Sequence, residues 1–208
     1  MLPSTCAQCT IRACQKAGHE NMPKNCPMQN EELMQKAYDT YALPEIHQFA
    51  VEAAEMTAAG YGQWPRIKEI IQFCKRMGYT RVGLAFCSGL KKEAKIADDL
   101  FRKAGLEVVS VMCKAGGMSK DDFGIPKEAR VHPGEYEAVC NPIGQAMIMN
   151  EQKTQFNITF GLCVGHDSLF NKYSEAMVTA LVVKDRALGH NPIAAIYCAD
   201  GYFKNRIL

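Results

Sequence analysis

The sequence lacks the features that mark several common protein classes. Its 208 residues carry a net charge of only +2, which is too small to indicate a nucleic-acid partner or an anionic membrane surface. No apolar run approaches the roughly 20 residues of a membrane-spanning helix. The first residues have neither the basic start nor the apolar stretch of a secretory signal. We therefore expect a cytoplasmic protein with no nucleic-acid and no membrane partner.

Motifs of nucleotide chemistry and of hydrolysis are missing as well. No Gly-x-Gly-x-x-Gly follows an expected strand and no Gly-x4-Gly-Lys-Ser/Thr occurs, so nothing indicates a dehydrogenase or an NTPase. The Gly-x-Ser-x-Gly elbow and the His-Glu-x-x-His zinc motif are absent too. Hydrophobic residues make up 48% and charged residues 22%, which is typical of a globular chain with a core of its own.

Cysteine, in contrast, is abundant, with ten in the chain. In a reducing compartment many thiols indicate metal or redox chemistry rather than disulfides. Four of them follow the spacing Cys-x2-Cys-x4-Cys-x11-Cys, at Cys6, Cys9, Cys14 and Cys26. Four thiolates suit tetrahedral zinc or an iron–sulfur cluster. The chain lacks the paired Cys-x2-Cys knuckles of zinc ribbons, and Pro27 follows the last cysteine, which favours iron–sulfur; His19 is an alternative ligand.

The hydrophobic pattern changes along the chain. Helical periodicity extends to residue 78, and short apolar runs then alternate with amphipathic segments. We expect strands at 81–87, 106–113, 157–163, 178–184 and 193–198. This alternation predicts an α/β fold, a parallel-sheet three-layer domain of the Rossmann or flavodoxin-like kind. The expected organisation is a cysteine-rich metal-binding module (1–30), a helical segment packed on the core (31–78) and the α/β domain (79–208).

Most of the remaining cysteines fall where a parallel sheet binds its ligands, at the carboxyl ends of strands. Strand ends hold Cys87, Cys113, Cys163 and Cys198, while Cys140 precedes Asn141-Pro142, the expected cap and first turn of a helix. A helix N-terminus favours a thiolate, so Cys140 is expected to be acidic. Cys74 lies late in a helix and is expected in the core. The segment 114–139 fits no element, and we expect a functional lid or an oligomer contact there, or else a secondary-structure element that the pattern does not reveal.

Several of these residues are candidates for chemistry. Cys87, Cys113, Cys140 and Cys163 are the predicted cofactor ligands; the alternative is that each is an ordinary packing residue. The candidate catalytic groups are Cys140, Cys163 and His166, since His166 follows a glycine turn after an expected strand, and Asp167 is placed to cap the next helix. The trio 184–186 is expected to be an ion-paired loop or a substrate contact.

The chain resembles a prokaryotic family, domain of unknown function 1847, that is described only as metal-binding. The motifs that carry the resemblance are Cys6-Ala7-Gln8-Cys9, Cys140-Asn141-Pro142-Ile143, Gly161-Leu162-Cys163-Val164-Gly165-His166-Asp167 and Gly189-His190-Asn191-Pro192. The resemblance implies metal binding through the cysteines and no established reaction. Many members come from anaerobes, which favours iron–sulfur over zinc.

These observations predict a cysteine-rich metal-binding protein that holds an iron–sulfur cluster and has a redox, electron-transfer or sensing role. Two alternatives stay open. In one, the amino-terminal thiolates hold a structural zinc and the α/β domain binds a ligand. In the other, the protein is a thiol-dependent enzyme that uses Cys140 or Cys163. A redox partner or a small molecule is the expected partner, and homo-oligomerisation remains open.

Overall fold

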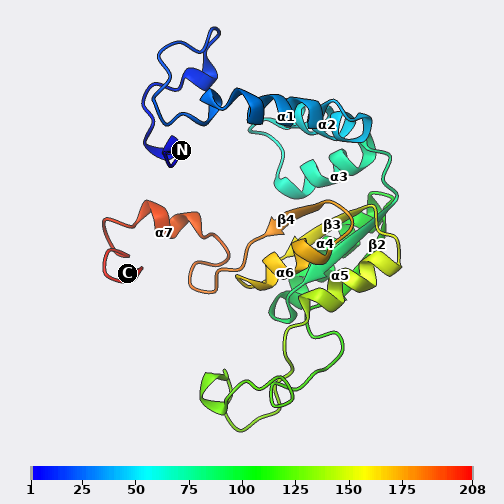
Figure 1. Ribbon diagram of the computed structural model, residues 1–208. Helices are drawn as coiled ribbons and strands as arrows, with labels where there is room; N and C mark the ends of the chain where they lie inside the picture. The colour runs from blue at the N-terminus through cyan, green and yellow to red at the C-terminus, as the bar shows by residue number, and fades with distance from the viewer. Residues whose placement is uncertain (1, 208) are drawn as a thin grey trace. The chain divides into compact units, whose positions relative to one another are not determined.

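The computed structural model describes residues 2–207 and divides the chain into two units (Figure 1). The first unit extends to Glu55 and the second begins at Met56. The boundary falls within helix α2 (Pro44–Gly60), so helix α3 (Arg66–Arg76) belongs to the unit that contains the sheet. No helix in residues 2–207 combines the length and the apolar character needed to cross a membrane.

The first unit consists of short turns followed by a helix. Three 3-10 turns, Cys6–Gln8, Ala13–Gln15 and Pro27–Gln29, precede helix α1 (Glu31–Tyr41). Helix α1 begins at Asn30, whose side chain accepts the backbone N–H of Leu33 at 3.1 Å. Within the described residues 2–30, Ala13 alone is buried, so this segment has almost no apolar core.

The second unit is built on a four-stranded sheet. The strands are β1 (Arg81–Phe86), β2 (Glu107–Met112), β3 (Phe156–Phe160) and β4 (Val178–Val182), in the order β2-β1-β3-β4. All three neighbouring pairs are parallel, which confirms the predicted α/β fold. The chain order reverses between β1 and β3, which is where open α/β sheets bind ligands.

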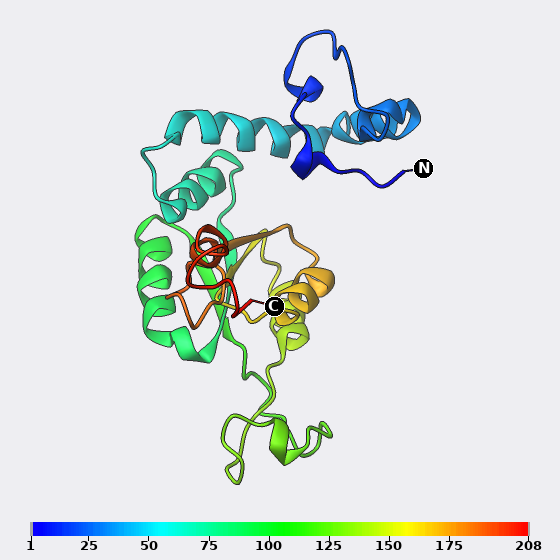
Figure 2. The same cartoon turned by 90° about the vertical axis from the view of Figure 1, so that its left-hand side faces the viewer.

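Helices cover both faces of this sheet (Figure 2). Helix α4 (Lys91–Lys103) lies on one face, and helices α5 (Pro142–Glu151) and α6 (His166–Tyr173) pack together on the other. Helix α4 buries the apolar side of its lysine-rich sequence, including Phe101, which is fully buried. The predicted three-layer arrangement is therefore present.

The expected fifth strand is wrong, because residues 193–197 form a short helix, α7 (Ile193–Tyr197). A short apolar run does not distinguish a helix from a strand, and its two alanines favour the helix. Pro192 supplies the cap of α7 in helical conformation. Cys198, expected at a strand end, instead follows this helix and is exposed.

The long connection 114–139 joins β2 to α5 and extends away from the sheet as a loop (Figure 1). A single antiparallel bridge joins Ser119 to Ala138 near its base. Farther out, the guanidinium of Arg130 forms an ion pair with Asp121 at 2.6 Å. The bridge and the ion pair hold this segment in one conformation, although its sequence shows no helical or strand periodicity.

A buried polar group lies between the sheet and the α5–α6 face. Asn157 of β3 is fully buried; its Oδ1 accepts the Thr154 hydroxyl and its amide donates to the Ser174 hydroxyl, both at 2.7 Å. Gly83 of β1 leaves the space for this side chain. A Cβ at Gly83 would lie 2.1 Å from Asn157 Oδ1 and 2.5 Å from the sulfur of Met149. The core at this point tolerates no added atom.

Gly83→Ala should therefore destabilise the protein by about 1–3 kcal/mol, the usual cost of overpacking a filled core. Gly201→Ala is the matched control, because the nearest atom to its added Cβ is 3.8 Å away. Urea unfolding of both variants measures the difference in the free energy of unfolding. Equal stability of the two variants would contradict the packing described for Gly83.

Candidate functional site

The carboxyl edge of the sheet holds four cysteines at the ends of its elements. Cys87 directly follows β1, Cys113 directly follows β2, and Cys163 lies three residues after β3. Cys140 lies just before Asn141, whose side chain accepts the Gly144 N–H at 2.8 Å and caps α5 as predicted.

Backbone hydrogen bonds extend the sheet pairing to these residues. The N–H of Cys87 donates to the Phe160 carbonyl at 3.1 Å, and the N–H of Cys113 donates to the Phe86 carbonyl at 2.8 Å. The Cys113 carbonyl in turn accepts the N–H of Asn141 at 2.7 Å. The positions of the cysteine backbones are thus set by the sheet itself.

The four sulfurs form a connected set. Cys87 interacts with Cys113, and Cys113 with Cys140. The thiol of Cys113 also donates to the Ser88 hydroxyl at 3.8 Å. Cys140 and Cys163 interact electrostatically. Cys87 and Cys113 are buried in the core cluster between the sheet and α5–α6, whereas Cys140 and Cys163 are half-buried. The four cysteines therefore extend from the apolar core, at Cys87 and Cys113, to the surface, at Cys140 and Cys163.

Each sulfur also contacts a donor nitrogen. The nearest cations are Lys114, with Nζ 3.4 Å from the sulfur of Cys140, and Arg186, with Nη2 3.3 Å from the sulfur of Cys163. The ammonium of Lys184 lies beside Gly89 together with the sulfur of Cys87, and the backbone N–H of Ser88 donates to the sulfur of Cys113 at 3.3 Å. Three cations and a backbone amide thus lie near the four sulfurs, and such donors favour the thiolate of the sulfur that they contact.

The loop that carries two of these cations differs from the expected ion-paired loop. In the described part of the chain none of residues 184–186 forms an ion pair with a carboxylate. Asp185 accepts the N–H groups of Ala187 and Leu188, both at 3.0 Å, and so closes a tight turn. Lys184 and Arg186, on either side of Asp185, remain available to the sulfurs of Cys87 and Cys163.

The local environment gives Cys140 and Cys87 different pKa values. The hydrogen bond from Cys113, together with the charge of Lys114, lowers the pKa of Cys140 to about 6, although burial opposes the change. The hydrogen bond that Cys87 donates to Cys113, together with burial, raises the pKa of Cys87 to about 12. Near neutral pH, Cys140 is a thiolate and Cys87 a thiol donor.

The other sequence candidates lie apart from this set. His166 begins α6 and its backbone N–H donates to the Cys163 carbonyl at 2.9 Å, but no hydrogen bond joins its imidazole to a sulfur among the described residues. Asp167 does not cap α6: Gly165 occupies the cap, and the Asp167 carboxylate accepts the N–H of Ser168. Cys74 is fully buried in α3, which confirms its place in the core.

The amino-terminal cysteines are only partly assembled. Cys6, Cys9 and Cys26 line one hollow of about 200 Å³, while Cys14 is exposed and is not part of its wall. Across residues 2–207, no three side chains of His, Cys, Asp or Glu converge closely enough to hold a single metal ion. The ligand set of this module therefore stays a prediction.

Sequence reasoning missed two donors, Lys114 and Ser88. Each directly follows an edge cysteine in the chain, so the rule that places Cys113 and Cys87 at the carboxyl edge also places their neighbours there. Whether a neighbour turns toward a sulfur depends on the path of the loop, which the sequence pattern does not specify.

In protein freed of metal and reduced, Cys140 should react with iodoacetamide with a pH midpoint near 6, because its thiolate is favoured by Cys113 and Lys114. Lys114→Met should move this midpoint upward, while the exposed Cys198 serves as an internal control. Mass spectrometry of peptides from alkylated protein measures both rates. A Cys140 midpoint near that of a free cysteine, about 8.5, would contradict the environment described.

Two comparisons relate the chain to known proteins. A family described as "Protein of unknown function (DUF1847)" matches residues 26–181, a range that includes all four edge cysteines and, of the amino-terminal four, Cys26. The uncharacterised protein MJ0455 of Methanocaldococcus jannaschii is 43% identical over 203 residues, which cover 98% of this chain and 97% of that protein. The match and the relative extend over the sheet and its thiol-bearing edge, and the chain belongs to the DUF1847 family.

Proposed function

We propose that the protein holds an iron–sulfur cluster at the carboxyl edge of the sheet, with Cys87, Cys113, Cys140 and Cys163 as ligands, and acts in electron transfer or redox sensing. The observation that carries the proposal is the connected set of four sulfurs at the point where the chain order of the sheet reverses. Thiolates are the ligands that such clusters require, and a bound cluster supplies one-electron redox chemistry.

The donors around the sulfurs also suit a cluster. Hydrogen bonds to cluster sulfurs and nearby positive charge are the means by which proteins raise the reduction potential of iron–sulfur centres. Here Ser88 N–H, Lys114 and Arg186 provide them within 3.4 Å. The three cations also make this edge suited to an acidic redox partner or an anionic small molecule.

A second centre in the amino-terminal module is part of the proposal, with Cys6, Cys9, Cys14 and Cys26 as ligands. The segment has almost no buried residues, and the non-glycine residues Arg12, His19 and Asn21 all adopt left-handed backbone conformations. Such conformations cost free energy and need a further constraint to persist. Metal–thiolate bonds would provide that constraint, with zinc as the alternative metal, and a reducing compartment would keep the thiols free.

Metal analysis of protein purified without oxygen tests both centres. Cys140→Ser and Cys163→Ser should each lower the iron and acid-labile sulfide content by about one cluster per chain and remove visible absorption. Cys198→Ser, an exposed cysteine outside both sets, is the matched control and should change neither. Cys9→Ser and Cys26→Ser report on the amino-terminal centre separately.

The outcomes separate the hypotheses. Unchanged iron and sulfide in both edge variants would refute the cluster at the sheet edge. Zinc in place of iron, lost only in Cys9→Ser and Cys26→Ser, would favour the structural-zinc alternative and leave the edge without a metal.

A thiol-dependent reaction is the second candidate function, favoured by the position of Cys140. Cys140 directly precedes the N-cap of α5, and its sulfur lies 3.4 Å from the Lys114 ammonium, which activates a nucleophile. Alkylation before and after treatment with a chelator distinguishes the roles. A ligand resists alkylation until the metal is removed, whereas a nucleophile reacts at the same rate in both states.

A further inference from the structure

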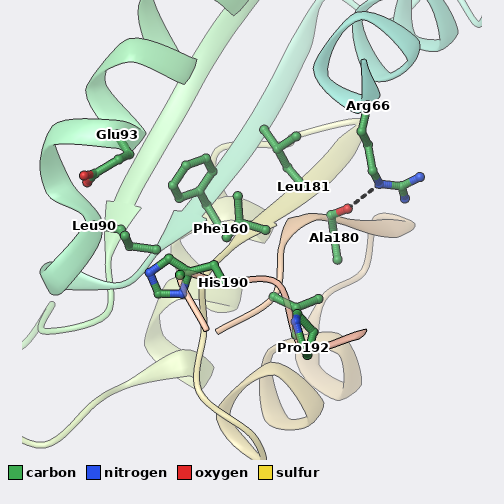
Figure 3. A pocket seen from close by; sticks show the side chains of 11 residues that line it. Arg66, Leu90, Glu93, Phe160, Ala180, Leu181, His190 and Pro192 are labelled. Atoms are coloured by element: carbon green, nitrogen blue, oxygen red, sulfur yellow. Dashed lines mark hydrogen bonds between the residues drawn. The ribbon is translucent and has the colours of Figure 1, made fainter. Parts of the chain in front are cut away.

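A cavity of about 590 Å³ lies on the α4 side of the sheet, over the carboxyl ends of β3 and β4 (Figure 3). Its volume is within the range of pockets that bind small molecules. Most of its wall is apolar; Leu90, Phe160, Leu181 and Val182 contribute. Three side chains with polar groups also reach it: Arg66, Glu93 and His190.

His190 is held in this wall by its own loop. Its backbone N–H donates to the Asp185 carbonyl at 2.8 Å, and its Nδ1 accepts the Asp185 N–H at 3.1 Å. Because Nδ1 is an acceptor here, the proton of the neutral ring is on Nε2. No described protein group accepts from Nε2, so the ring offers an unused N–H donor beside Leu90 and Phe160 (Figure 3).

The backbone of His190 is also strained, with φ at +67°. A residue with a Cβ adopts this conformation at a cost in free energy, and such residues concentrate at ligand sites. Gly189, also in the left-handed region at +57°, shares the wall of the cavity. The left-handed backbone at Gly189 and His190 thus places the imidazole in the wall of an apolar cavity.

A second donor comes from Arg66 at the start of α3. Its Nε donates to the Ala180 carbonyl at 2.7 Å (Figure 3), and its Nη2 donates to the Thr179 hydroxyl at 2.8 Å. Within the described chain its Nη1 has no acceptor. Two fixed donors on an apolar wall suit a ligand with an apolar body and an acceptor oxygen, and the positive charge of Arg66 favours a carboxylate. Glu93 is exposed and also lines the cavity, on the side of Leu90, where its negative charge opposes an anion.

The cavity adjoins the edge thiols through the same loop. Residues 183–190 place Val183 and His190 on the cavity, while Lys184 lies near the sulfur of Cys87 and Arg186 donates to the sulfur of Cys163. The loop that would contact a ligand through His190 therefore also carries Lys184 and Arg186, the two cations nearest to Cys87 and Cys163. Binding in the cavity itself uses no sulfur and requires no metal.

We propose that this cavity is a binding site for a small organic carboxylate with an apolar body, whose oxygen accepts a hydrogen bond from His190 Nε2 and whose negative charge is favoured by Arg66 in the same wall. The site is separate from the proposed cluster, so each can be tested alone. Benzoate is the probe, and benzylammonium, with the same ring and the opposite charge, is the matched control ligand.

Titration calorimetry of the full chain, in metal-loaded and in metal-free form, measures binding of both probes. We expect saturable benzoate binding in both forms and at least about tenfold weaker benzylammonium binding. His190→Asn should weaken benzoate at least about tenfold, because it removes a hydrogen bond to a charged group while asparagine tolerates the left-handed backbone. Glu93→Gln should leave benzoate binding equal or stronger.

A cavity-filling variant keeps the test independent of His190. Ala180→Leu adds bulk to the cavity wall and should abolish benzoate binding. Ala187→Leu, at an exposed position of the His190 loop outside the cavity wall, should not. Absence of benzoate binding at millimolar concentration, equal binding of the two probes, or benzoate binding unchanged in both His190→Asn and Ala180→Leu would overturn the proposal. Loss of iron binding in the edge variants without loss of benzoate binding leaves it intact.

Discussion

The site depends on one electrostatic constraint: Cys140, one of four cysteines at the carboxyl edge of a parallel sheet, carries a thiolate in a half-buried position and needs compensating charge beside it. Thiolates in a partly apolar site repel one another unless cations or donors compensate. The chain supplies Lys114, Lys184 and Arg186 from two different loops, and a backbone amide for Cys113. Of these groups, Lys114 lowers the pKa of Cys140 together with the Cys113 thiol; all of them would stabilise the negative charge of the proposed cluster.

The hydrogen bonds of the sheet fix the backbone positions of the edge cysteines. Cys87 and Cys113 take part in the strand hydrogen bonds, so their backbones cannot shift without disturbing the sheet. Behind them, Gln145 of α5 is fully buried and donates to the carbonyl oxygens of Phe86 and Val111, which joins the ends of β1 and β2 to the helix. A site supported in this way loses little entropy when it binds a ligand.

The two cysteine groups differ in how they are supported. The edge group lies on a folded core, so its geometry exists without a metal. The amino-terminal group lies on short turns with Ala13 as the buried residue, and three of its cysteines border a shallow hollow. Metal binding would therefore be coupled to folding in the amino-terminal module and would add redox chemistry to a preformed site at the edge. This contrast suits a division into one structural and one functional centre.

The sequence by itself determined the alternation of strands and helices, the cap at Asn141 and the position of Cys87, Cys113 and Cys140 at the ends of elements, because these follow from local periodicity and the geometry of parallel sheets. It did not determine residues 193–197, where a short apolar run fits a helix as well as a strand. Nor did it reveal Lys114 and Ser88 as sulfur donors, or His190 as the wall of a cavity. Those roles arise from loop paths and from contacts between residues far apart in the chain, such as Arg186 with Cys163 and Arg66 with Ala180. Only the tertiary structure decides such contacts, because hydrogen-bond partners in loops depend on side-chain packing across the fold and not on local sequence.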